Sequence, residues 1–206
     1  MINKAIAQFQ SDLTSLAWVE NYGGLTHIVS NPSISDDGSR YPVSQFCNFE
    51  QCWNGGVYKA LVPDSNTKSL MYYEQIGSTT DAGDSFRVGD VSLDTPVRLF
   101  TWVNLQKIGL DQTTTKSPFI NDILNIFKVV KSSDGARFEV KLTEIETDDI
   151  TKEQFAKYNY NNLERLLYYP YLAITMTFNF NIKGDVSCMD SVAVGEEIAC
   201  KNYSYT

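Results

Sequence analysis

The sequence predicts an α+β fold: a mostly antiparallel sheet packed by an N-terminal helix and a second short helix, with a long β excursion and a C-terminal arm. Three observations predict it. Apolar residues recur at helical spacing near the N-terminus and again after position 117. From residue 172 to 182, large apolar side chains alternate without a miss with small or polar ones. Several short strand-like runs, separated by Gly, Pro, Asp and Asn, lie between these segments.

The first helix is expected over residues 2–18. Its apolar positions form one stripe: Ile2, Ile6, Phe9, Leu13 and Leu16. Gly23 and Gly24 follow and are expected to stop the helix. Residues 25–29 are short enough to be either a strand or an extended lead into the next turn.

The middle of the chain is expected to form strands at 43–49, 56–62, 69–76, 85–88 and 97–106. The triplet Asn54-Gly55-Gly56 is a hairpin turn signal. Residues 97–106 carry bulky groups on both faces, with Val97, Leu99 and Val103 on one and Phe100 and Trp102 on the other. Such a strand is covered on two sides, by a helix and by something else, for which a neighbouring subunit is one option.

The second helix is expected at 118–130, with Ser117 as its N-cap and Pro118 as its first helical residue. Its apolar face comprises Phe119, Ile120, Ile123, Leu124, Phe127 and Val130. A strand at 138–143 and the long strand at 171–182 follow, the latter buried on one face only. That face, Leu172, Ile174, Met176, Phe178 and Phe180, is expected to pack on the first helix.

At 206 residues the chain suits one domain. We expect a single domain over 1–182, with an excursion at 77–94 and an insertion, loop or small helix, at 148–162. Residues 183–206 form the C-terminal arm. It is either an arm lying on a partner or an edge hairpin that closes the domain.

Composition argues against several classes of function. The formal charge of −8 disfavours binding to nucleic acid phosphates and to anionic membrane surfaces, and no apolar run reaches membrane-spanning length. The four cysteines, Cys47, Cys52, Cys188 and Cys200, are too sparse for a disulfide scaffold and too loosely spaced for zinc. We therefore expect free thiols and no metal.

No catalytic pattern emerges from the residues. His27 is the single histidine, and no nucleophile motif accompanies it. The carboxylates Glu144, Glu146, Asp148 and Asp149 cluster at a strand end, as solvated charge runs do. Glycine-rich nucleotide-binding motifs are lacking, so no cofactor is expected. Tyrosine runs such as Tyr168-Tyr169-Pro170-Tyr171 fit a core edge or a protein interface.

The expected elements follow one another as a helix at 2–18, antiparallel strands, a strand at 97–106, a short helix at 118–130, a strand at 138–143 and a long final strand at 171–182. This order resembles that of the tail-terminator and tail-completion proteins of tailed bacteriophages. It also looks like the neck ring proteins of crAss-like podoviruses. The excursion, the insertion and the arm depart from that pattern. The resemblance implies a virion structural protein that assembles as a ring between head connector and tail, and no enzyme.

The resemblance implies partners and a location. The chain would contact itself in a cyclic homo-oligomer and adjacent neck, portal-side or tail proteins, while DNA only passes through and no membrane is bound. It would be assembled in the host cytoplasm and reside in the virion. Candidate subunit-interface residues are Phe86, Val88, Phe100, Trp102, Val192, Val194, Ile198, Tyr203 and Tyr205. Two alternatives are an aromatic-rich module that binds protein or glycan, and a small hydrolase with an unrecognised site.

Overall fold

The computed structural model describes residues 2–30, 40–44, 53–54, 57–58, 61, 63, 65–83, 90–133, 136–146 and 168–185. Its helical elements are α1 (Ile2–Thr14), the short 3-10 helix η1 (Gln106–Ile108) and α3 (Ser117–Phe127). Its strands are β1 (Asn21–Ser30), β2 (Arg40–Ser44), β3 (Trp53–Asn54), β4 (Val57–Tyr58), β5 (Ser69–Gln75), β6 (Thr80–Asp81), β7 (Asp90–Asn104), β8 (Lys131–Ser133), β9 (Ala136–Glu146) and β10 (Tyr171–Asp185).

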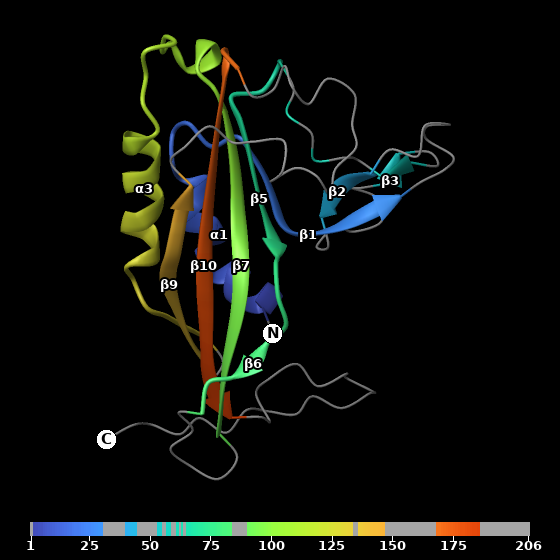
Figure 1. The fold of residues 1–206 in the computed structure, drawn as a ribbon, viewed down its shortest axis with the longest axis vertical. Coiled ribbons are helices and arrows are strands. Elements are labelled where there is room, and N and C mark those ends of the chain that lie inside the picture. The colour runs from blue at the N-terminus through green and yellow to red at the C-terminus, as the bar shows by residue number, and fades with distance from the viewer. Residues whose placement is uncertain are drawn as a thin grey trace.

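The main sheet has eight strands in the order β2-β1-β5-β7-β10-β9-β8, with β6 paired to β7 (Figure 1). All its pairings are antiparallel except that of β1 with β5, which is parallel. Strands β3 and β4 form a separate two-stranded antiparallel sheet, with Asn54 opposite Val57. The predicted α+β class, with a mostly antiparallel sheet packed by the N-terminal helix, is confirmed.

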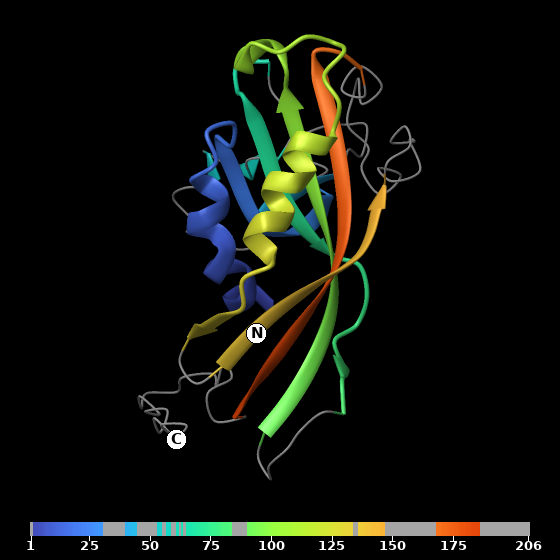
Figure 2. The ribbon, with the colours of Figure 1, turned by 90° about the vertical axis from the view of Figure 1, so that its left-hand side faces the viewer.

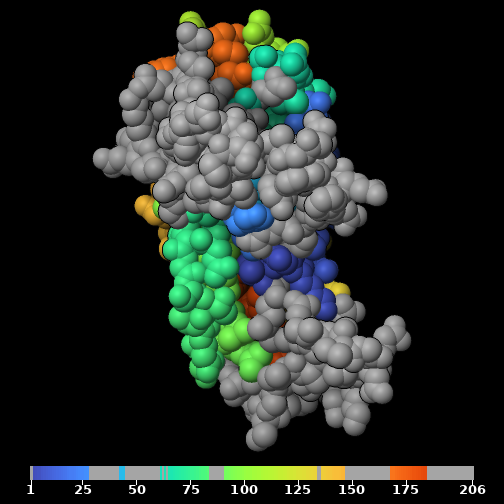
Figure 3. Space-filling model, turned by 90° about the vertical axis from the view of Figure 1, so that its right-hand side faces the viewer, coloured from blue at the N-terminus to red at the C-terminus, as the bar shows by residue number. Residues whose placement is uncertain are grey.

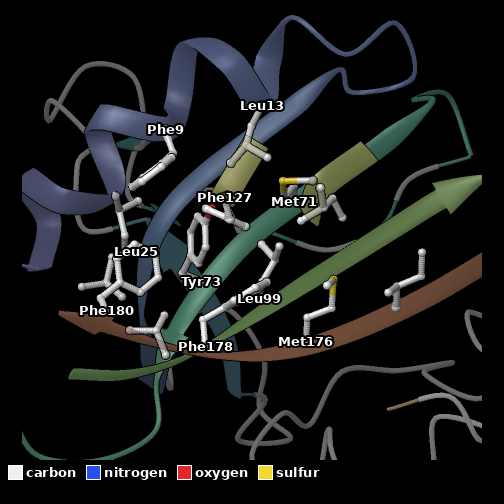
Figure 4. Packing of buried hydrophobic residues seen from close by; sticks show 14 of the residues in the cluster. Phe9, Leu13, Leu25, Met71, Tyr73, Leu99, Phe127, Met176, Phe178 and Phe180 are labelled. Carbon is white, nitrogen blue, oxygen red and sulfur yellow. The ribbon is translucent and has the colours of Figure 1, made fainter. Parts of the chain in front are cut away.

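Helices α1 and α3 lie together on one face of this sheet (Figure 2). Aromatic rings join the layers, because Phe127 of α3 lies 5.1 Å from Phe9 of α1 and 4.7 Å from Phe178 of β10, measured between ring centroids. Phe180 also packs edge-on against Phe9, at 6.2 Å. Figure 4 shows these rings close together between α1 and the sheet. This cluster is the hydrophobic core of the domain.

Strand β10 lies between β7 and β9, and it pairs with β7 along its whole length, from Tyr171↔Asn104 to Asp185↔Asp90. Its helix-facing residues Ile174, Met176, Phe178 and Phe180 are buried as expected, whereas Leu172 is only partly buried. They pack on both helices and not on α1 alone. The expected burial of one face only is wrong, because Thr175 and Thr177 on the other face are buried too.

Three local expectations need correction. Helix α1 ends at Thr14 and not at Trp18. At this end the Thr14 hydroxyl donates to the Gln10 carbonyl at 2.8 Å. Gly23 and Gly24 lie inside β1, where the pairing with β5 shifts register and Gly24 has a φ of 63°, so the pair forms a bulge. Lys116 is the N-cap of α3, so Ser117 is already helical.

The segment 77–94 stays with the sheet over its described parts. Thr80 and Asp81 form β6 along the edge of β7, and residues 90–94 begin β7 itself. The Ala82 N–H donates to the Ser92 carbonyl at 2.7 Å and extends this contact. In Figure 3 this green segment forms a narrow column at the surface. Strand β10 likewise runs into the expected arm as far as Asp185.

Other expected features lie outside the described residues. They are the strand at 85–88, the insertion at 148–162, most of the arm and all four cysteines. The expected strands at 43–49 and 56–62 are described only in part, as β2 and β4. In the described part of the chain, no helix combines the length and apolar character that crossing a bilayer requires.

Candidate subunit interface

Two of the nine candidate interface residues fall within the described chain. Phe100 and Trp102 lie on β7 and face away from the helices, and each is 1% exposed in the single chain. The Phe100 ring stacks on Tyr72 of β5, with centroids 5.1 Å apart. Strand β7 has a strand on each side, and both of its faces are covered. The two side chains therefore expose almost no surface that a neighbouring subunit could contact. Phe100 and Trp102 are therefore buried within the single chain, and their place at a subunit interface stays a prediction.

The remaining candidates lie outside the described residues: Phe86, Val88, Val192, Val194, Ile198, Tyr203 and Tyr205. The structure therefore brings together Phe100 and Trp102 alone from this set.

A polar strip, defined as Arg98, Glu146, Thr175 and Thr177, crosses the same face next to Phe100. Arg98 of β7 forms an ion pair with Glu146 of β9 at 3.5 Å, and both side chains are mostly buried. The Thr175 hydroxyl donates to the other oxygen of Glu146 at 2.7 Å. The hydroxyl of Thr177 and the Nε of Arg98 are buried, and neither has a hydrogen-bond partner among the residues that the structure describes. The strip ties β7, β10 and β9 together and leaves two polar atoms unsatisfied.

In the part of the chain that the structure describes, exposed apolar side chains lie at two places. At one end of the sheet are Tyr168 (71% exposed), Tyr169 (49%) and Leu110 (41%), the end patch. The Leu105 N–H donates to the Pro170 carbonyl and the Leu110 N–H to the Leu105 carbonyl, each at 2.8 Å, so the two turns are joined (Figure 1). The sequence predicted a core edge or a protein interface for these tyrosines, but no sequence pattern predicted the exposure of Leu110.

The second place follows the C-terminal end of α3, where Val129 is 53% exposed and Val130 46%. We call this pair the valine patch. Val130 was expected on the buried face of the helix. The helix ends at Phe127, so the chain has left the helical path before Val130 and carries its side chain outward.

Within the described ranges, the outer edge of β9 lacks a partner strand over most of its length. Strand β8 covers only Ala136–Phe138. Among the described residues no strand pairs with that edge from 139 to 146. The inner edge pairs with β10, with a register shift beside Thr143. An open strand edge presents unpaired N–H and C=O groups, which makes it a template for another chain.

Two tyrosines with shifted pKa values lie on the helix side of the sheet. Tyr22 of β1 and Tyr73 of β5 lie edge to face, with ring centroids 6.0 Å apart. Burial raises the pKa of the Tyr22 hydroxyl well above its ordinary value. Burial, and then the nearby Tyr22, raise the pKa of Tyr73 as well. Both rings remain neutral through the physiological range.

His27 is exposed on β1 opposite Val43. Within the part of the chain that the structure describes, no three His, Cys, Asp or Glu side chains gather as a metal site would require. No protein-family model matches the sequence. A search of curated proteins likewise gave no match.

Proposed function

We propose that this chain is a ring-forming structural subunit of a bacteriophage neck, joining head connector and tail while genome DNA passes through. Two features of the fold support the proposal that the chain is a neck subunit of this kind. The N-terminal helix and the second helix pack side by side on one face of the sheet. The element order is the one on which the resemblance to tail-terminator and tail-completion proteins rests.

The observation that carries the proposal is the pair of separate apolar patches. The end patch and the valine patch lie beyond opposite ends of α3 (Figure 1). A ring closes through a heterologous contact, in which each copy offers two different surfaces to its two neighbours. Exposed valines and tyrosines of this kind gain free energy when a partner removes them from water.

Charge supports the passage of DNA. The formal charge is −8, and a wall of that sign does not retain the phosphate backbone electrostatically. Partners above and below the ring would be portal-side, neck or tail proteins. The proposed location is the virion, after assembly in the host cytoplasm.

The test is the mass of the purified full chain by native mass spectrometry, together with negative-stain images. We expect one closed oligomer. The variant Val129→Glu should reduce assembly at least tenfold, because it places a carboxylate in an apolar contact. Its control is Gln10→Glu, which adds the same charge at an exposed position of α1. A monomeric wild-type chain at tens of micromolar, or equal assembly of both variants, would contradict the proposal.

A further inference from the structure

Exposed charge is distributed unevenly over the described part of the chain. Strands and loops carry exposed charged side chains, such as Lys68, Asp81 and Arg137. Helices α1 and α3 carry none, although the structure describes both from end to end. Their exposed polar side chains are amides and hydroxyls: Gln10, Ser11, Thr14, Ser117, Asn121 and Asn125. We call this side of the two helices the outer helix surface.

The charged residues that α1 and α3 do contain are turned to contacts within the chain. Asp12 forms an ion pair with Lys131 of β8. Asp122 is half-buried and accepts a hydrogen bond from the Trp18 indole N–H at 2.9 Å. Lys4, the remaining charged residue of these two helices, is half-buried as well. A helix at a protein surface usually carries charged residues on its outer side, so this surface differs from an ordinary solvated one.

The outer helix surface is neutral without being apolar. Ala7 and Pro118 are its exposed side chains that lack a polar group. A stable subunit contact buries apolar groups at its centre, and the exposed apolar groups lie instead in the end patch and the valine patch. Burying the outer helix surface against a second copy would desolvate amides and hydroxyls with little hydrophobic gain. Such a surface suits a partner that passes over it without being held.

We propose that the outer helix surface lines the lumen of the ring and faces the phosphate backbone of the passing DNA. The inference rests on the proposed ring. Over the length of α3, about 16 Å, a duplex carries about ten phosphate charges. Exposed lysines would retain these phosphates, and exposed carboxylates would repel them. Amides and hydroxyls do neither, because they exchange hydrogen bonds to water for hydrogen bonds to DNA at little net gain.

The experiment adds positive charge to the outer helix surface of the full chain. Gln10→Lys with Asn121→Lys places one exposed lysine on each helix. The matched control, Ser78→Lys with Thr80→Lys, places two exposed lysines at β6 on the sheet. Preassembled rings of each variant are mixed with one plasmid in two forms, linearised once or covalently closed, and the retained DNA is measured. A closed ring can be threaded only by a duplex with a free end, so the two forms report where the lysines lie.

We expect the helix variant to retain at least about tenfold more linear plasmid than wild type at about 50 mM salt and to release it at about 200 mM. It should not retain the closed circle, and the control should not distinguish the two forms. Equal retention of both forms, no gain over wild type, or a preference for linear plasmid in the control would overturn the lumen assignment and leave the ring standing.

Assembly of the helix variant is a second readout, with circular dichroism as the check that the variant is folded. A folded helix variant that no longer assembles would show that the outer helix surface is buried between copies, and would overturn the inference. A wild-type chain that is monomeric would overturn the ring itself and this inference with it.

Discussion

The two faces of the sheet are both buried but are built from different chemistry. The helix-covered face is apolar almost throughout and closes on rings from α1, α3 and β10. The opposite face places Phe100 and Trp102 beside the ion pair of Arg98 with Glu146. Apolar packing tolerates small rearrangements, whereas a buried ion pair needs a fixed geometry. The helix face is therefore held by apolar burial, whereas the opposite face combines apolar burial with a polar contact between β7 and β9.

The largest effect should come from a charge on the helix face. Met176 is 1% exposed, so Met176→Asp buries an unpaired carboxylate. We expect a cost of about 4 kcal/mol or more and a largely unfolded chain. The control is Asn179→Asp on the opposite, half-buried side of the same strand. Thermal unfolding by circular dichroism measures both, and a wild-type melting temperature for Met176→Asp would show that the face is misassigned.

Truncation of one large ring on each face compares them directly. Trp102→Ala on the opposite face and Phe178→Ala on the helix face should each cost about 3–5 kcal/mol, because both rings are buried within the chain. Urea unfolding at low protein concentration gives both values. A small cost for Trp102→Ala, below about 1 kcal/mol, would mean that this face is not part of the single-chain core.

Alkaline pH should act through the helix face. Tyr22 and Tyr73 have raised pKa values in the folded protein, so their contribution is complete below the unfolded pKa, near 10, and is lost as pH rises above it. Each tyrosine should lower the free energy of unfolding by about 1.4 kcal/mol per pH unit there. Urea titrations between pH 8 and 11 measure the slope. Tyr22→Phe should flatten it, because it removes one of the two buried hydroxyls.

The smallest effects should distinguish two threonines of the polar strip. The Thr175 hydroxyl donates to Glu146, so Thr175→Val should cost about 1.5–3 kcal/mol. The buried Thr177 hydroxyl has no partner within the described part of the chain, so Thr177→Val should gain about 1 kcal/mol. Chemical denaturation of the two variants side by side supplies the comparison. Equal changes of the same sign would mean that both hydroxyls have the same environment.

The periodic spacing of apolar residues predicted the helix and the long strand whose packing depends on that spacing. The stripe of α1 and the alternation of β10 appear as expected, because each depends on neighbouring residues along the chain. The burial of Thr175 and Thr177 was not predictable, since polar residues at alternate positions indicate an exposed face. Nor was the parallel pairing of β1 with β5, which joins segments distant in sequence.

The candidate interface was harder to predict for the same reason. Phe100 and Trp102 are bulky and lie on the second face of a strand, a pattern shared by interfaces and by two-sided cores. Val130 continued the apolar spacing of α3 and was assigned to the core. Its exposure depends on where the helix ends. The open edge of β9 depends on how far β8 extends, which no local pattern specifies.

The central position of β10 has a consequence for the timing of folding. The strand that comes last along the described chain pairs on one side with β7 and on the other with β9. During synthesis, β7 and β9 therefore leave the ribosome as separate edges and stay without their shared partner until residue 185 follows. Contacts between such distant segments slow folding and prolong the exposure of unpaired edges. We expect the sheet to close only after translation of β10, so chaperone dependence should concentrate in that interval.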